Sequence, residues 1–164
     1  MSAAETLPPR GRSRSRMLAW AAVLVACDQA AKWATHSKVT GGMELGWRWL
    51  RIAPSQNPGG LFGLFEGQRV LLTAVSGAVL FALLVWAWRG AGKSRLVDVG
   101  LSLAIAGAAG NLADRLVLGY VRDFIHVGPW PAFNVADALI TIAVGVFLLA
   151  AIGRGRPRGG QGCI

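Results

Sequence analysis

Four apolar stretches of about twenty residues each constrain the fold of this chain more than any other feature. They run from Met17 to Thr35, from Val70 to Trp88, from Leu96 to about Leu118 and from Phe133 to Ile152. As a helix, each is long enough to cross about 30 Å of hydrocarbon at about 1.5 Å per residue. The mean hydropathy is +0.47 and only 15% of the residues are charged. We therefore expect an all-α integral membrane protein with four transmembrane helices.

The positions of the basic residues predict how the chain is oriented. The sequence holds 17 Lys and Arg against 8 Asp and Glu, a net charge of +9, which in a soluble chain would suggest a nucleic-acid partner. However, ten of the seventeen cations lie in residues 10–16, 89–95 and 154–158, each segment adjoining an apolar stretch. The positive-inside rule places such segments in the cytoplasm. We expect no nucleic-acid partner and both termini in the cytoplasm.

The same pattern predicts the domain organisation. Residues 1–16 form a disordered basic cytoplasmic N-terminus, residues 17–152 a four-helix membrane domain, and residues 153–164 a basic cytoplasmic tail. The first apolar stretch follows an Arg-rich start, as in a signal peptide. It carries Asp28 and Lys32 and has no clear small-x-small cleavage motif, so we expect it to remain in the mature protein.

The segment between the first two apolar stretches predicts a small extracytoplasmic β-sheet. Residues 43–50 alternate apolar and polar side chains, which is typical of a half-buried strand. Residues 55–63 hold one Pro and three Gly, which favour turns. Tryptophans in this segment fit a membrane interface, although ordinary loop aromatics remain an alternative.

Ionisable side chains inside the apolar stretches indicate polar centres within the membrane domain. Asp28 and Lys32 are i,i+4 neighbours, and we expect a structural ion pair between them. The third apolar stretch carries glycine and polar residues at spacings of three and four near its outer end. These are Gly107, Asn111, Asp114 and Arg115. Gly107 and Gly110 would allow close helix approach, and the polar residues would face the bundle interior.

Asp123 and Asp137 are the candidate catalytic pair. If the segment between the third and fourth stretches folds back, both carboxylates lie at one depth, near the outer leaflet. Two carboxylates in a poorly hydrated site do not both ionise readily, so one keeps a proton while the other can activate water. The alternative is that Asp137 only caps the fourth helix.

The sequence gives little support to a metal site or to a serine nucleophile. Only His36 and His126 are available as imidazoles, so we expect no metal site and no cofactor. Ser76 lies in an apolar stretch with no His or Lys placed to activate it.

Five segments together resemble the lipoprotein signal peptidase family, also called signal peptidase II. They occur in the family's order over residues 17–152. The segments are Asp28-Gln-Ala-Ala-Lys32-Trp33, Asn57-Pro-Gly59-Gly-Leu-Phe62-Gly63, Gly107-Ala-Ala-Gly110-Asn111-Leu-Ala-Asp114-Arg115, Val121-Arg-Asp123-Phe-Ile and Phe133-Asn134-Val-Ala-Asp137. The resemblance implies an intramembrane aspartyl endopeptidase of the bacterial inner membrane. Such an enzyme removes signal peptides from diacylglyceryl-modified prolipoproteins, just before the lipidated cysteine.

The resemblance also implies residue roles. Asp123 and Asp137 match the catalytic dyad, and Asp28, Lys32 and Asp114 match structural positions. The residues that match substrate-contacting or dyad-supporting positions are Asn57, Gly59, Asn111, Arg115 and Asn134. Arg122 departs from the family pattern, which is usually apolar there, and would lower the pKa of the neighbouring Asp123 carboxyl.

The partners expected from the resemblance are a lipid-modified prolipoprotein, membrane lipid and globomycin-type peptide inhibitors, and we expect a monomer. The alternative function is a non-enzymatic four-helix membrane carrier or assembly factor. It would use the intramembrane charges for ion relay or packing.

Overall fold

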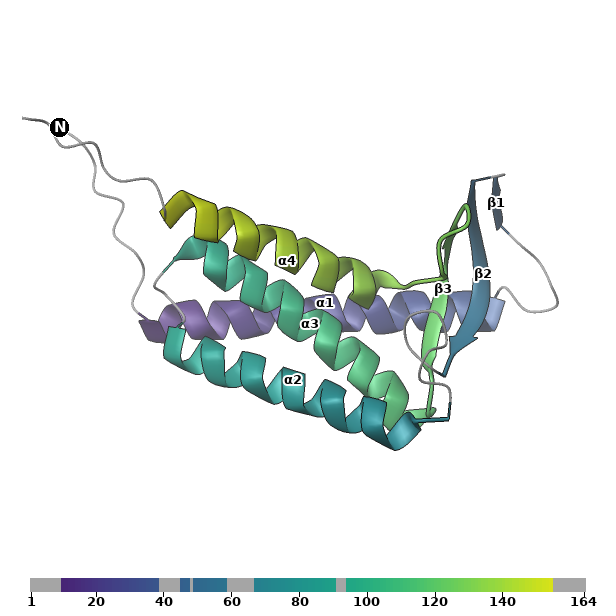
Figure 1. Cartoon of the computed structure of the whole chain (residues 1–164), viewed down its shortest axis with the longest axis horizontal. Helices are drawn as coiled ribbons and strands as arrows, with labels where there is room; N and C mark the ends of the chain where they lie inside the picture. Colours follow the sequence, from purple (N-terminus) through teal and green to yellow (C-terminus); the bar gives the residue numbers. More distant parts are fainter. Residues whose placement is uncertain (1–9, 39–44, 48, 59–66, 91–93, 155–164) are drawn as a thin grey trace, which may run out of the picture.

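The computed structural model describes residues 10–38, 45–47, 49–58, 67–90 and 94–154 (Figure 1). Four long helices and one small sheet make up this part of the chain. The helices are α1 (Arg10–Lys38), α2 (Arg69–Gly90), α3 (Arg95–Val117) and α4 (Val135–Arg154). The strands are β1 (Leu45–Trp47), β2 (Leu50–Asn57) and β3 (Val121–Val127).

Each expected apolar stretch lies largely in a helix, and among the described residues three helices meet a common measure for a membrane span. By length and composition, α2, α3 and α4 can cross a membrane. α1 has 29 residues and is long enough. Its second half carries Asp28, Gln29 and Lys32, which lower its hydropathy. The described part of the structure therefore supports a membrane protein with three candidate spans, and the expected count of four is not confirmed.

The start of α1 differs from our expectation. Residues 10–16, which we expected to be disordered, are helical. Two contacts hold this segment to the neighbouring helices. The Arg14 guanidinium lies 4.6 Å from the ring centroid of Trp88, and Ser13 donates a hydrogen bond to Asp98. These tertiary contacts extend the apolar helix into the arginine-rich segment.

α3 is the central helix, since α1, α2 and α4 all pack against it. Two glycines allow close approach in its C-terminal half, toward the sheet. A Cβ atom on Gly107 would collide with the Ala136 carbonyl oxygen of α4, and one on Gly110 would lie 2.6 Å from Asp28 Oδ2 of α1. The expected close approach at Gly107 is confirmed. The three helices therefore meet most tightly where the polar residues lie.

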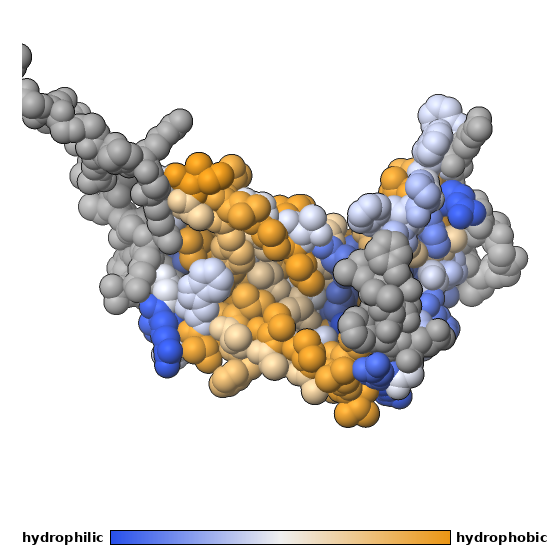
Figure 2. All heavy atoms as spheres, in the orientation of Figure 1, coloured by the Kyte–Doolittle hydropathy of each residue, from blue (hydrophilic) through white to orange (hydrophobic). Residues whose placement is uncertain are grey.

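Apolar side chains cover the outer faces of the helical part of the molecule (Figure 2). Phe81 on α2 is 70% exposed, and Leu149 on α4 is 63% exposed. Most of the surface of α2 and α4 is apolar and is not covered by protein. These faces therefore suit contact with lipid. Polar side chains gather instead where the helices meet the sheet (Figure 2).

The sheet has three antiparallel strands in the order β1-β2-β3. The single strand expected over residues 43–50 is wrong, because β1 ends at Trp47 and the chain turns at Trp49 into β2. β2 continues to Asn57, across residues expected to form turns. β3 comes from the segment between α3 and α4, so the sheet is not confined to the connection between α1 and α2 as expected.

The sheet lies at one end of the helical bundle (Figure 1). The N-terminal end of α1 and the C-terminal end of α4 lie together at the opposite end. β3 lies between the C-terminal end of α3 and the start of α4, and it carries Asp123 close to the first turn of α4.

Candidate active site

Asp137 is held in the first turn of α4. Its backbone N–H donates to Asn134 Oδ1 at 3.0 Å, and the Asn134 N–H donates to Asp137 Oδ2 at 3.2 Å. This reciprocal pair is a capping box, which fixes both side chains at the helix start. The capping role that we considered is therefore present. The same carboxylate also lines a cavity, so capping does not exclude a catalytic role.

Asp123 lies on β3 with only 1% of its surface exposed. Two asparagine amides donate hydrogen bonds to its carboxyl group. Asn57 Nδ2, at the end of β2, lies 2.9 Å from Asp123 Oδ2, and Asn134 Nδ2 lies 2.6 Å from Asp123 Oδ1. The register places Asn57 opposite Val121, so pairing of β2 with β3 brings this amide to the aspartate.

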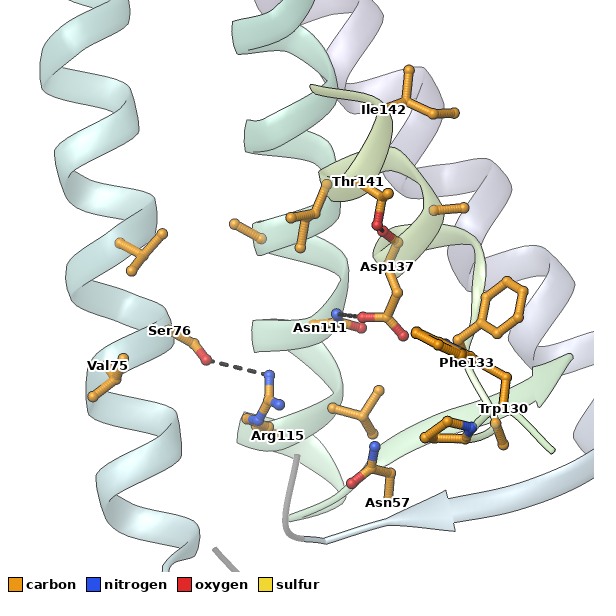
Figure 3. A pocket seen from close by; sticks show the side chains of 17 residues that line it. Asn57, Val75, Ser76, Asn111, Arg115, Trp130, Phe133, Asp137, Thr141 and Ile142 are labelled. Carbon is orange, nitrogen blue, oxygen red and sulfur yellow. Dashed lines mark hydrogen bonds between the residues drawn. The ribbon is translucent and has the colours of Figure 1, made fainter. Parts of the chain in front are cut away.

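A third asparagine joins the two carboxyl groups. Asn111 Nδ2 on α3 donates to Asp137 Oδ1 at 2.7 Å (Figure 3). Its Oδ1 accepts from Asn134 Nδ2 at 3.2 Å and from Lys32 Nζ at 3.1 Å. These donors determine which way the Asn111 amide points. The structure thus brings together Asp123, Asp137 and the three asparagines in one hydrogen-bonded network.

Burial raises the pKa of Asp123 to about 6. The hydrogen bond from Asn57 opposes this rise, and the negative charge of Asp137 adds to it. A carboxyl group with this pKa exchanges a proton near neutral pH, which suits a general acid or base.

Arg122 does not act on Asp123 as expected. Side chains alternate along β3, and the Arg122 guanidinium instead lies 2.6 Å from Asp114 Oδ1 and donates to Gln29 Oε1 at 2.7 Å. The expected lowering of the Asp123 pKa is therefore wrong. Gln29 was missed by the sequence analysis, although it lies inside the first of the five motif segments.

Asp28, Lys32 and Asp114 form a buried ionic cluster, which Lys32 connects to the network through its hydrogen bond to Asn111. Lys32 Nζ lies 2.8 Å from Asp28 Oδ2 and 3.3 Å from Asp114 Oδ2, and all three side chains are fully buried. The expected ion pair of Asp28 and Lys32 is confirmed. Asp28 Oδ1 also accepts the backbone N–H of Ala136 at 2.9 Å, which ties α1 to the start of α4.

A cavity of about 810 Å³ opens beside Asp137. Figure 3 shows its lining, which comes from α2, α3, α4, the end of β2 and the segment before α4. Apolar side chains such as Val79, Ile140 and Ile142 make up most of the wall. The polar side chains of the lining are Asn57, Ser76, Asn111, Arg115, Asp137 and Thr141. An apolar cavity with a few converging polar groups is typical of a ligand or substrate site.

Arg115 lies in this lining, and among the described residues its Nη1 donates a hydrogen bond to Ser76 Oγ of α2 at 3.2 Å (Figure 3). Sequence reasoning considered Ser76 only as a nucleophile and missed this contact. Gly59, the remaining expected site residue, lies outside the described residues. Within the described residues, no cluster of three His, Cys, Asp or Glu side chains is placed to hold a metal ion.

The fold and site define a membrane protein with two carboxyl groups linked by asparagines at an apolar cavity. A family model described as signal peptidase (SPase) II matches residues 20–153. A lipoprotein signal peptidase from Shouchella clausii is 36% identical over 143 residues, covering 83% of this chain and 92% of the relative. One from Methylorubrum extorquens is 41% identical over 156 residues, covering 88% and 89%.

Two solved structures share the fold, and both are described as bacterial membrane enzymes. One has a TM-score of 0.81 at 26% identity and covers 92% of this chain and 94% of its own. The other has a TM-score of 0.76 at 28% identity, with 84% and 93% covered. The chain therefore belongs to the signal peptidase II family, and it is a bacterial membrane peptidase. The non-enzymatic carrier or assembly factor is not favoured.

Proposed function

We propose that this peptidase is an intramembrane aspartic endopeptidase with Asp123 and Asp137 as its catalytic pair. One observation carries the proposal: Asn134 donates a hydrogen bond to each carboxyl group, from its side chain to Asp123 and from its backbone N–H to Asp137. Asn111 bonds both to Asp137 and to the Asn134 side chain. Together they hold two carboxyl groups beside an apolar cavity. Ser76 is part of the cavity lining, but its hydroxyl donates to the Leu72 carbonyl oxygen, and no cysteine, histidine or lysine lies among the described residues of the lining.

The two carboxyl groups take different parts in this mechanism. Asp137 faces the cavity and, when ionised, takes a proton from a water molecule that attacks the scissile carbonyl carbon. Asp123 is more deeply buried and carries the proton that is given to the carbonyl oxygen. Asn57 bonds to Asp123 and also lines the cavity, so substrate entry would exchange this hydrogen bond for one to the substrate. Collapse of the tetrahedral intermediate then breaks the C–N bond: the amine leaves with the proton that Asp137 took from water, and a hydroxyl of the intermediate returns a proton to Asp123 as the new carboxyl group forms.

The proposed substrate is a prolipoprotein that carries a diacylglyceryl group, cut just before the lipidated cysteine. The curated relatives are called lipoprotein signal peptidases. The cavity wall between α2 and α4 is apolar, which fits acyl chains and an apolar signal peptide arriving from the bilayer. Globomycin-type peptides would occupy the same cavity, and the monomer has every element that this mechanism uses.

The proposed topology has four spans, with α1 as the first. Arg14, Arg89 and Arg95 lie on the helix ends away from the sheet, and the positive-inside rule puts that end in the cytoplasm. Both termini then lie in the cytoplasm, with the sheet and the two aspartates near the outer leaflet of the inner membrane.

Cleavage of a defined substrate tests the proposed function. We expect the purified protein in detergent to cut a prolipoprotein peptide whose cysteine carries a diacylglyceryl thioether, with mass spectrometry placing the cut before that cysteine. The matched control is the same peptide without lipid, which should be cut at least about tenfold more slowly because it cannot bury acyl chains in the cavity. Equal cleavage of both peptides, or cleavage of neither, would contradict the proposal.

The raised pKa of Asp123 predicts the pH dependence of cleavage. Asp123 is protonated below its pKa of about 6 and loses its proton above it. If Asp123 must deliver a proton, its contribution to kcat/KM should be constant below about pH 6. Above that pH, kcat/KM should fall by about tenfold per pH unit. A pH–rate profile of the wild-type enzyme, with stability checked at each pH, measures this. If kcat/KM instead rises from pH 6 to 8, Asp123 is not the proton donor, and Asp137 would have that role.

A further inference from the structure

Ser76 lies outside the aspartate network, yet it is the residue to which the cavity's arginine is attached. Its hydroxyl donates to the Leu72 carbonyl oxygen at 2.7 Å within α2. The same oxygen accepts from Arg115 Nη1 at 3.2 Å, across the α2–α3 contact. The back-bond to Leu72 directs the hydroxyl proton into the helix, which leaves the oxygen lone pairs for the guanidinium. Ser76 is therefore arranged as an acceptor.

Arg115 carries a positive charge close to two carboxyl groups without pairing with either. Both Asp137 and Asp123 act on it electrostatically. Asn111, which bonds Asp137, lies one helical turn before Arg115 on the same face of α3. Nevertheless, in the part of the chain that the structure describes, the guanidinium has a hydrogen bond to Ser76 and no ion pair with an aspartate. Arg122 shows the contrasting case, since it is tightly paired with Asp114.

The position of Arg115 matters for the chemistry of the cavity. A guanidinium in a poorly hydrated site is strongly attracted to a carboxylate, and a bidentate pair would occupy both carboxylate oxygens. Each Asp137 oxygen already accepts one hydrogen bond, from the Asn111 side chain or the Asn134 backbone, so such a pair would leave the carboxylate no lone pair to accept a proton from water. A guanidinium held on the α2 side instead keeps its remaining N–H donors in the cavity and leaves Asp137 open.

We propose that Ser76 is a positioning residue that holds the Arg115 guanidinium on the α2 side of the cavity and so prevents it from pairing with Asp137. The inference rests on the proposed catalytic role of Asp137. Ser76 acts through Arg115 and takes no covalent part in cleavage. The connection also makes the packing of α2 against α3 part of the active-site geometry, although α2 supplies no carboxyl group to it.

Three variants at two sites test this positioning role. Ser76→Ala removes the acceptor and should lower kcat about tenfold while KM changes less than about threefold, because substrate still binds but Asp137 is occupied. Ser76→Thr keeps the hydroxyl and should restore kcat to within about twofold of wild type. Thr73→Val is the matched control. Thr73 also donates to a carbonyl one turn earlier in α2, that of Arg69, but no arginine bonds to it.

The outcomes separate this inference from the proposed function. Failure of the wild-type enzyme to cut the lipidated peptide would overturn the proposed function. If the wild type is active, an unchanged kcat in Ser76→Ala, an equal loss in Thr73→Val, or a loss that Ser76→Thr does not restore would overturn the positioning role. Melting temperatures of all three variants, expected within about 2 °C of wild type, show that any loss is not caused by unfolding.

Discussion

Replacing Asp123 or Asp137 by asparagine should reduce cleavage of a lipidated prolipoprotein peptide by at least about a thousandfold. Asparagine has nearly the same shape as aspartate but neither takes a proton from water nor gives one to a carbonyl oxygen. General acid–base catalysis by a single group contributes about 10² to 10⁴ in rate, and the two carboxyl groups act as a unit. The double variant should therefore lose little more than either single variant.

The measurement is the single-turnover rate in detergent, with folding checked by thermal shift. Asp98→Asn is the matched control, because Asp98 is an aspartate of α3 that bonds Ser13 near the start of α1, away from the cavity. It should keep its cleavage rate within about threefold of wild type. Substantial cleavage by a folded Asp123→Asn or Asp137→Asn variant would rule out the aspartic mechanism.

Replacing Lys32 by methionine should strongly destabilise the protein. Lys32 lies between Asp28 and Asp114, and none of the three side chains is exposed. Loss of the cation leaves Asp114 with Arg122 as its partner and leaves Asp28, among the described residues, as a buried carboxylate without a cation. Breaking a buried ion pair by removing one partner costs about 3–5 kcal/mol. For a chain of this size, we expect the melting temperature to fall by about 10 °C.

A second substitution should reverse most of this loss. In Asp28→Asn/Lys32→Met the charges balance again, because Asp114 keeps Arg122 as its partner. The asparagine Oδ1 also still accepts the backbone N–H of Ala136. Thermal unfolding of both variants in the same detergent measures the recovery. A single variant that melts within about 2 °C of wild type would show that Lys32 does not hold the cluster together.

The helices could be predicted from the sequence because each apolar stretch carries its own signal along the chain. The third strand could not, since Val121–Val127 contains Arg122, Asp123 and His126 and resembles a polar loop. It becomes a strand only by pairing with β2, which is far from it in the sequence. In this pairing Ser55 of β2 lies opposite Asp123. The strand expected over residues 43–50 failed for the same reason, since pairing partners rather than alternation decide where β1 ends.

The candidate site was predictable to a similar extent. The spacing of Asp123 and Asp137 suggested a pair, and the family resemblance identified the three asparagines. The way Asn134 joins the carboxyl groups depends on the capping box of α4, which no spacing rule reveals. The side-chain directions of Arg122 and Arg115 depend on tertiary neighbours, Asp114 and Ser76 respectively, so the effect expected of Arg122 was assigned to the wrong carboxyl group.

The ion pair within α1 has a consequence for how the protein is made. During synthesis α1 emerges first, long before Asn111, Asp114 and Ala136, which complete its polar contacts. Asp28 and Lys32 are one turn apart on the same helix, so the nascent helix already contains a counter-ion for each charge. In the proposed four-span topology, residues 17–35 would therefore enter the bilayer with no net formal charge, before α3 and α4 are made. Separating the two charges onto different helices would leave an unpaired ion in lipid at that stage, so their adjacency serves insertion as well as the finished structure.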